Sequence, residues 1–161
     1  MDRQIHFYKH SGIYTLEVSQ ELSMSLAEAW EFFSTPLNLQ KITPKDMGFQ
    51  ITSKTAGKMH PGQIISYHVG IIPGIKTNWV TEITHVEKEQ FFVDEQRYGP
   101  YSMWHHEHHF TQVGDKVVMR DKVSYRLPFP WLTNLFHGIL IKPQLQKIFS
   151  YRLKVVDELF S

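Results

Sequence analysis

The chain has 161 residues, of which 42% are hydrophobic, 14% aromatic and 20% charged, and this length is enough for one domain with a substantial core. Its 17 basic and 16 acidic residues nearly cancel, which argues against binding to nucleic acid or to an anionic membrane. The chain contains no cysteine, so disulfides, thiol catalysis and cysteine-ligated zinc are excluded.

The N-terminal residues form no apolar signal region, and the longest apolar runs are far shorter than a membrane span. We therefore expect a single domain over residues 1–161 that lies in the cytoplasm and does not insert stably into a membrane. We expect it to be a monomer or a homodimer.

The first part of the chain predicts a strand followed by a helix. Residues 1–11 are a polar leader or the start of a first strand, and alternation predicts a strand from Ile13 to Leu22. Ser25 with Glu28 three residues later is a capping-box pattern, and it predicts a helix that runs to about Phe33.

A second short helix and a run of strands follow. Pro36 opens the helix, which ends before Pro44. Short turns separate the strands, a pattern typical of an antiparallel meander. The predicted strands are Phe49–Ser53, Gln63–Val69, Lys76–Val86, Gln90–Arg97, Tyr101–Phe110 and Lys116–Leu127.

The last part of the chain is predicted to be helical. Pro128 and Pro130 end the sheet, Trp131 to Ile141 forms a short helix, and Pro143 lies near the start of another. Residues 144–160 have apolar side chains at helical spacing, and at ~1.5 Å per residue this helix spans ~25 Å. A helix of this length laid over a curved antiparallel sheet gives an α+β domain.

Four histidines lie in the strand Tyr101–Phe110, where successive side chains point to opposite faces. We assign the face with aromatic ends to the interior and the polar face to solvent. Buried polar groups need partners, so two inward histidines are unusual. The inward face carries Trp104, His106, His108 and Phe110, and the outward face carries Met103, His105, Glu107 and His109.

A partner for these histidines lies on the next strand. The Gly114-Asp115 turn leads into a strand with one largely apolar face that contains Asp121. Paired across the hairpin, Asp121 comes near His106 or His108, and an imidazole makes the burial of its carboxylate tolerable. We expect these residues to form a polar patch on the wall of an internal pocket.

The order of these elements resembles the START-like, Bet v 1-like helix-grip fold: a curved antiparallel sheet of about six or seven strands around a long C-terminal helix, with two short helices after the first strand. Local motifs resemble the bacterial SRPBCC proteins, a branch labelled ligand-binding or polyketide cyclase-like. The matching stretches cover nearly the whole chain. They are Phe32-Phe33 through Pro36, Asn38-Leu39, Ile42-Thr43-Pro44, Phe92 to Gln96, Gly99-Pro100 through Trp104 to Phe110, Met119 to Tyr125, Ile148-Phe149 and Tyr151-Arg152.

The resemblance implies a deep pocket between the sheet and the long helix, usually for an apolar or amphipathic small molecule such as a lipid. It supplies no shared set of catalytic residues. Inward sheet faces line the pocket of such a fold, and we expect the cavity to be lined by Trp79, Phe92, Asp94, Gln96, Trp104, His106, His108, Phe110, Met119, Asp121, Val123, Tyr125, Phe149 and Arg152.

Several of these residues have a second interpretation. Asp94 and Gln96 form a polar pocket rim or pair with backbone at the strand end. Arg152 reaches a ligand carboxylate or, the interpretation we favour, forms a surface ion pair.

The His106-Glu107-His108 sequence is also a His-x-His pair. Same-face neighbours on a strand lie ~6.8 Å apart, so both rings can converge on one zinc or iron ion with Asp121 as a third ligand. Such pairs are common without metal, and the resembled family is not typically metal-dependent. We therefore expect no metal and no other cofactor.

We expect the protein to be a carrier or sensor that sequesters an apolar or weakly polar molecule, with His106, His108 and Asp121 orienting its polar end. The alternative is a cyclase, dehydratase or isomerase that transfers protons through a His/Asp site in the same cavity. A third class is a protein-interaction module with two apolar lips. One lip is the loop from Gly70 to Ile75, and the other consists of Trp131, Leu132, Leu135 and Phe136.

Overall fold

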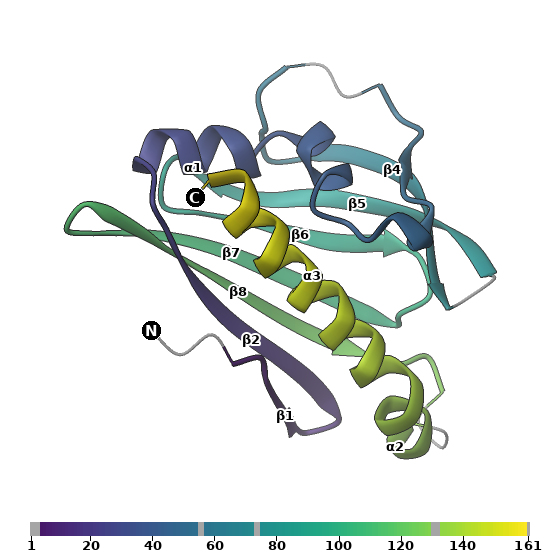
Figure 1. The fold of residues 1–161 in the computed structure, drawn as a ribbon. Helices are drawn as coiled ribbons and strands as arrows, with labels where there is room; N and C mark the ends of the chain where they lie inside the picture. The colour runs from purple at the N-terminus through teal and green to yellow at the C-terminus, as the bar shows by residue number, and fades with distance from the viewer. Residues whose placement is uncertain (1–3, 55–56, 73–74, 130–132, 161) are drawn as a thin grey trace.

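The computed structural model describes residues 4–54, 57–72, 75–129 and 133–160. In this part of the chain one antiparallel sheet of eight strands, in the order β1-β2-β8-β7-β6-β5-β4-β3, curves around the helix α3 (Figure 1). The strands are β1 (His6–His10), β2 (Ile13–Leu22), β3 (Gln50–Ile51), β4 (Gln63–Ile72), β5 (Ile75–Glu87), β6 (Phe91–Tyr98), β7 (Met103–Val113) and β8 (Lys116–Arg126).

Two groups of helices complete the fold. Between β2 and β3 lie α1 (Leu26–Phe33) and the 3-10 helices η1 (Pro36–Gln40) and η2 (Lys45–Met47). After β8 come α2 (Thr133–Phe136), the π-helical turn η4 (His137–Ile141) and α3 (Lys142–Phe160). This is the predicted helix-grip architecture, and the strand beyond the expected six or seven is the edge strand β1.

The capping box at the start of α1 is confirmed. The Ser25 side chain accepts a hydrogen bond from the Glu28 backbone N–H at 3.2 Å, and the Ser25 N–H donates to the Glu28 carboxylate at 2.9 Å. These two bonds satisfy groups that a helix end leaves unpaired. They fix where α1 begins, and α1 with the 3-10 helices then covers one end of the sheet (Figure 1).

The structure describes the two predicted apolar lips only in part. The first lip was predicted to be a loop from Gly70 to Ile75, and this is wrong for its first residues, because strand β4 continues through Ile72, which pairs with Ile75 of β5. Pro73 and Gly74 lie outside the described residues, as do Trp131 and Leu132 of the second lip. Leu135 and Phe136 are exposed.

The predicted break near Pro143 is a change of helix type. The chain is helical without interruption from Thr133 to Phe160, and the π turn η4 comes immediately before α3. Proline lacks the N–H of a regular helical bond, and its ring crowds the carbonyl four residues earlier. A π turn just before Pro143 accommodates both effects.

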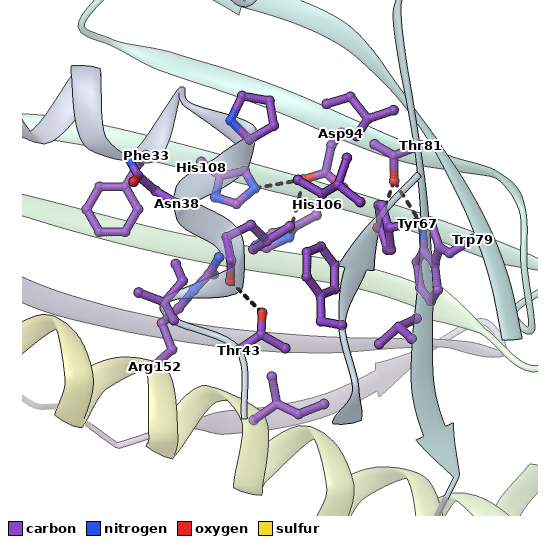
Figure 2. Close-up of a pocket in the computed structure, with 18 of the residues that line it drawn as sticks. Phe33, Asn38, Thr43, Tyr67, Trp79, Thr81, Asp94, His106, His108 and Arg152 are labelled. Carbon is purple, nitrogen blue, oxygen red and sulfur yellow. Dashed lines mark hydrogen bonds and ion pairs between the residues drawn. The ribbon is translucent and has the colours of Figure 1, made fainter. Parts of the chain in front are cut away.

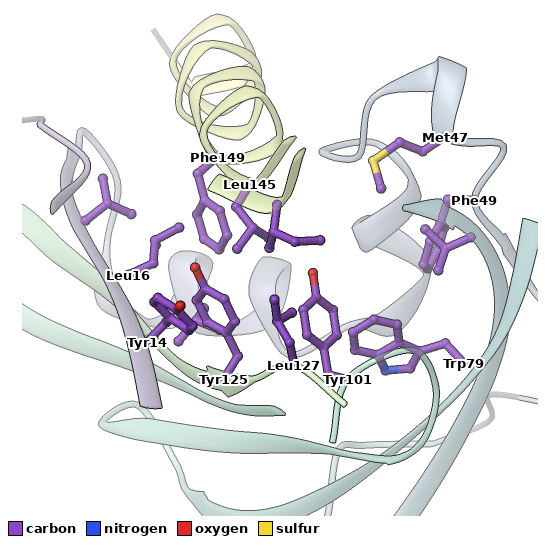
Figure 3. Close-up of a cluster of buried hydrophobic side chains, with 14 residues drawn as sticks. Tyr14, Leu16, Met47, Phe49, Trp79, Tyr101, Tyr125, Leu127, Leu145 and Phe149 are labelled. Atoms are coloured by element: carbon purple, nitrogen blue, oxygen red, sulfur yellow. The ribbon is translucent and has the colours of Figure 1, made fainter. Parts of the chain in front are cut away.

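The helix α3 crosses the concave face of the sheet (Figure 1), and one stripe of its side chains is buried. This stripe consists of Leu145, Phe149, Arg152 and Val156. The N-terminal half of α3 packs with β2 and β8 in one apolar cluster (Figure 3), while Val156 joins a second cluster with α1 and β7. One arginine in an otherwise apolar stripe indicates that a charged partner lies inside the protein.

Candidate ligand-binding site

A cavity of about 180 Å³ lies between the concave face of the sheet, α3 and the segment from α1 to η2 (Figure 2). Its sheet wall comes from the inward side chains of β3 to β7, because alternate residues of each strand face the same side. Most of the lining is apolar. It includes Phe32, Phe33, Leu39, Ile42, Met47, Phe49, Ile65, Val69, Trp79, Ile83, Phe92, Leu145, Ile148 and Phe149.

The structure places the predicted cavity residues in two groups. Those on the wall are Trp79, Phe92, Asp94, Trp104, His106, His108, Phe149 and Arg152. Those that do not line it are Gln96, Phe110, Met119, Asp121, Val123 and Tyr125.

For the residues of the second group the prediction that they line the cavity is wrong, and each of them is kept from the cavity by a specific contact. Phe110 and Met119 pack against Trp30 and its neighbours beneath α1, and Val123 and Tyr125 lie in the cluster beneath α3. Alternation identified their inward face correctly but did not show which inward residues a helix covers.

Gln96 pairs with backbone at the strand end. Its amide nitrogen donates to the Tyr101 carbonyl at 2.6 Å, and its amide oxygen accepts from the Tyr101 N–H at 3.1 Å. Of the two interpretations of this residue, the pocket rim is therefore wrong, and Gln96 instead holds the turn before β7.

Two histidines and two aspartates form a polar cluster at the cavity wall, and Figure 2 shows three of them, Asp94, His106 and His108. His106 Nε2 lies 2.8 Å from Asp121 Oδ1, and His108 Nε2 lies 2.8 Å from Asp94 Oδ2. Asp94 is opposite His106, and Asp121 is opposite His108, in the strand register. Both hydrogen bonds therefore run diagonally across the sheet, over a separation that long side chains can span.

The remaining ring nitrogens face the carboxylates without hydrogen bonds. His106 Nδ1 lies 3.5 Å from Asp94 Oδ2. His108 Nδ1 lies 3.0 Å from Asp121 Oδ1, but it is buried and has no hydrogen-bond partner with suitable direction among the described residues. The two rings lie with their centroids 3.7 Å apart, so both present their nitrogens to the same pair of carboxylates.

Arg152 completes the cluster from α3. Its Nη1 donates to Asp121 Oδ1 at 3.1 Å, and the residue is only 8% exposed. The favoured prediction of a surface ion pair is therefore wrong, because the pair is buried. Asp121 lies behind the histidines with two imidazoles and a guanidinium around it, and Arg152 also lines the cavity.

The cluster shifts the pKa of every acid and imidazole in it. Burial alone would raise the pKa of Asp121, but Arg152, His106 and His108 outweigh it and hold the pKa well below its usual value. Burial is likewise outweighed at Asp94, whose pKa is lowered by His106, His108 and Arg152. Burial and the neighbouring His108 lower the pKa of His106. At His108 burial is opposed and outweighed by Asp121 and Asp94, and the pKa is raised.

Tyr101 is a cavity residue that the sequence did not indicate. It is 6% exposed, and its hydroxyl has no hydrogen-bond partner among the described residues. Burial raises its pKa, so the hydroxyl stays protonated. Figure 3 shows this hydroxyl pointing away from the sheet, into the interior between Leu145 and Met47.

The wall formed by α1, η1 and η2 was also missed, as was a small polar group on β4 and β5. There Thr81 Oγ1 lies 3.0 Å from the Tyr67 hydroxyl and accepts from the Trp79 indole N–H at 2.9 Å. The alternation that put Trp79 and Thr81 on one face could have identified this polar group. No comparable signal in the sequence marks the helical wall, because its residues have the pattern of ordinary core positions.

Comparison with known proteins gives a likeness in structure alone. No family model matches the chain, and no curated protein is similar in sequence. A protein of Thermus thermophilus shares 12% identity over 89% of this chain and 94% of its own, with a TM-score of 0.68. A Chromobacterium violaceum protein shares 13% over 91% and 96%, also with a TM-score of 0.68. Norcoclaurine synthase of Thalictrum flavum shares 15% over 97% and 96%, with a TM-score of 0.65.

At these identities the likeness shows a shared Bet v 1-like fold and nothing about activity. The three solved structures match 89%, 91% and 97% of this chain, so the likeness extends over most of the fold. Among the described helices, none combines the length and apolar character needed to cross a lipid bilayer.

Proposed function

We propose that this protein binds a small, uncharged, ring-containing molecule in the cavity, with the molecule's polar end against Asp94, His106 and His108. The observation that carries this proposal is the combination of an apolar cavity with one concentrated polar cluster on its wall. Small-molecule sites typically have this composition, in which apolar walls supply affinity and a few polar groups fix orientation.

The size of the cavity narrows the ligand class. An engineered apolar cavity of about 150 Å³ holds a benzene molecule, so the present volume of about 180 Å³ suits a single ring with one or two small substituents. A sterol or a long acyl chain is much larger, and the cavity would hold only part of such a ligand.

The charge of the cluster favours a neutral ligand. The carboxylates of Asp94 and Asp121 are already contacted by His108, His106 and the guanidinium of Arg152. Arg152 already pairs with Asp121 and does not need a ligand carboxylate for compensation. A ligand carboxylate at the wall would face the like charge of Asp94, and a buried ligand charge without an opposite partner is costly.

The Tyr101 hydroxyl offers a second polar contact. The Trp104 ring is near both polar groups, with its centroid 4.8 Å from that of the Tyr101 ring and 6.3 Å from that of the His106 ring. A buried hydroxyl without a partner is unfavourable. A ligand with a second oxygen or nitrogen at this end would satisfy it.

The proposal is tested by titrating the protein with 4-hydroxyacetophenone, a neutral single ring with oxygens at both ends, while following backbone amide NMR shifts. We expect saturable shifts on the inner sides of β5 to β7, and weaker binding of benzoate. Ile65→Phe adds bulk to a lining residue that is 6% exposed, and Ile64→Phe adds the same bulk to its outward neighbour, which is 51% exposed.

Binding should be lost in Ile65→Phe and kept in Ile64→Phe. Equal binding by both variants would place the probe outside the cavity and refute the proposal. Failure of every neutral single-ring probe to saturate the wild-type protein would refute it as well.

A second candidate function is proton transfer on a bound carbonyl compound, as in a cyclase, dehydratase or isomerase. The specific observation is the His106–Asp121 hydrogen bond of 2.8 Å, because a carboxylate that fixes one imidazole nitrogen leaves the other, here Nδ1 on the side of Asp94, to exchange a proton with a substrate at the wall. Norcoclaurine synthase is an enzyme with the same fold. His106→Gln would then abolish turnover of a bound carbonyl compound while binding survives, whereas loss of binding alone would favour a carrier.

A further inference from the structure

We propose that Asp94, His106 and His108 bind one divalent transition-metal ion at the cavity wall, through Asp94 Oδ2, His106 Nδ1 and His108 Nε2. This inference does not depend on the organic ligand proposed above. It differs from the expectation drawn from the sequence, which was that no metal binds and in which Asp121 was the candidate third ligand.

The three ligand atoms are already close together. Asp94 Oδ2 lies 2.8 Å from His108 Nε2 and 3.5 Å from His106 Nδ1, and each of the three residues offers one ligand atom within 4.8 Å of the other two. Zinc-class ions bind such atoms at about 2.0–2.2 Å, so tetrahedral ligands stand about 3.3–3.5 Å apart. Small side-chain rotations are therefore enough to form the site.

The present arrangement is unfavourable at one point without a cation. When His106 donates through Nε2 to Asp121, its Nδ1 lone pair faces Asp94 Oδ2 at 3.5 Å. Two electron-rich atoms then face each other across a gap in a buried site. A cation between them would be attracted to both atoms.

The groups behind the ligands also suit a metal. Metal-binding histidines usually donate their second ring N–H to a carboxylate, which fixes the tautomer. Asp121 lies 2.8 Å from His106 Nε2 and 3.0 Å from His108 Nδ1, so one carboxylate faces the second nitrogen of both rings. Arg152 fixes Asp121 in turn at 3.1 Å.

Arg152 also decides which carboxylate is the ligand. Its guanidinium contacts Asp121 Oδ1, so a metal ion on that side would face a fixed positive charge at short range. Asp94 lies on the opposite side of the rings and lines the cavity, whereas Asp121 does not. The open coordination positions therefore face the cavity, where a ligand oxygen can complete them.

Two imidazoles and one carboxylate suit zinc, iron(II) or cobalt(II) better than calcium or magnesium, which prefer all-oxygen sites. Metal binding displaces the proton from His108 Nε2, so it should release a proton and weaken at acidic pH.

The test is a titration of chelator-treated, full-length protein with Co²⁺, followed by visible absorption and calorimetry. We expect one Co²⁺ per chain with the absorption of low-coordinate cobalt. Asp94→Asn and His108→Gln should abolish this signal. Asp121→Asn should weaken affinity about 10–100-fold, the usual effect of removing a carboxylate behind a metal ligand.

The matched control is the double variant His105→Gln/His109→Gln on the outer face of β7, where each histidine contacts a surface glutamate. It should keep the full signal. Loss of Co²⁺ binding in this variant, with retention in Asp94→Asn, would show an adventitious surface site only and overturn the inference. So would absence of stoichiometric binding in the wild type.

A second measurement needs no variant and guards against misfolding. Paramagnetic shifts of amide signals in the wild-type protein should centre on the inner side of β6 and β7. Shifts centred on the outer face would contradict the proposal.

Discussion

Arg152 and Asp121 form an ion pair inside the protein, with Nη1 and Oδ1 3.1 Å apart and both side chains at most 10% exposed. The pair joins the middle of α3 to β8. Removing one member of a buried pair leaves an uncompensated charge, which usually costs more than the pair itself contributes.

We therefore predict that Arg152→Met lowers the free energy of unfolding by about 3 kcal/mol, as measured by urea denaturation. The matched variant Lys154→Met removes the exposed partner of Glu158 on the same helix and should have little effect, because surface pairs contribute little. Adding Asp121→Asn to Arg152→Met should restore part of the loss. Equal costs for Arg152→Met and Lys154→Met would contradict the buried pair.

Tyr101→Phe should stabilise the ligand-free protein. The hydroxyl is buried without a partner, and its removal relieves a desolvation penalty of about 1 kcal/mol or more. The control is Tyr67→Phe, which removes a hydroxyl bonded to Thr81 at 3.0 Å and should cost about 1 kcal/mol. Thermal unfolding of the two variants should move in opposite directions. A Tyr101→Phe variant as destabilised as Tyr67→Phe would mean that the Tyr101 hydroxyl is bonded.

The stability of the protein should fall between pH 6.5 and about 4 because of His137. The Nε2 atom of this ring and the Tyr125 hydroxyl oxygen form a hydrogen bond of 2.7 Å, and the ring stacks on Tyr14. Burial, with Lys142 and Lys9 nearby, lowers its pKa from 6.5 to about 4. The unfolded chain then binds more protons in this window, so protonation favours unfolding and stability is lost as the pH falls.

The variant that isolates this effect is His137→Gln, which keeps an acceptor but cannot titrate. The full shift corresponds to about 3 kcal/mol, and solvent screening reduces this to about 1–2 kcal/mol. The difference between wild type and variant should shrink or reverse by that amount from pH 7 to pH 4. Urea denaturation at several pH values measures it. A pH-independent difference would show that His137 does not titrate in this range.

Much of the sheet could be predicted because alternating side chains and short turns are local features of the sequence. The alternation of β7 and β8 identified the inward face that carries His106 and His108, both of which are buried. The proximity of Asp121 followed from the short Gly114-Asp115 turn, since a hairpin turn fixes register. The capped start of α1 is equally local.

The hydrogen-bond partner of Asp94 could not be predicted from the sequence. The bond between Asp94 and His108 depends on the register of β6 with β7 and on diagonal side-chain reach. The neighbouring β5–β6 pairing contains two irregularities, and a single bulge changes which residues oppose each other. Alternation therefore gave the face of Asp94 but not its partner.

The burial of Arg152 and the inward direction of Tyr101 were not predicted, for two different reasons. An arginine in an amphipathic helix is normally solvated. Only the position of α3 over β8 shows that Arg152 contacts Asp121. Tyr101 precedes β7, where alternation no longer applies, and its inward direction depends on the turn that Gln96 holds.

The most direct test of the account is native mass spectrometry of the protein purified from its own host, beside the denatured sample and the Ile65→Phe and Ile64→Phe variants. We predict an added organic mass of single-ring size on the wild type and on Ile64→Phe, lost on denaturation and absent from Ile65→Phe. An organic mass carried equally by both variants would contradict a ligand in the cavity, and so would a wild-type protein that carries none and binds no neutral single-ring probe.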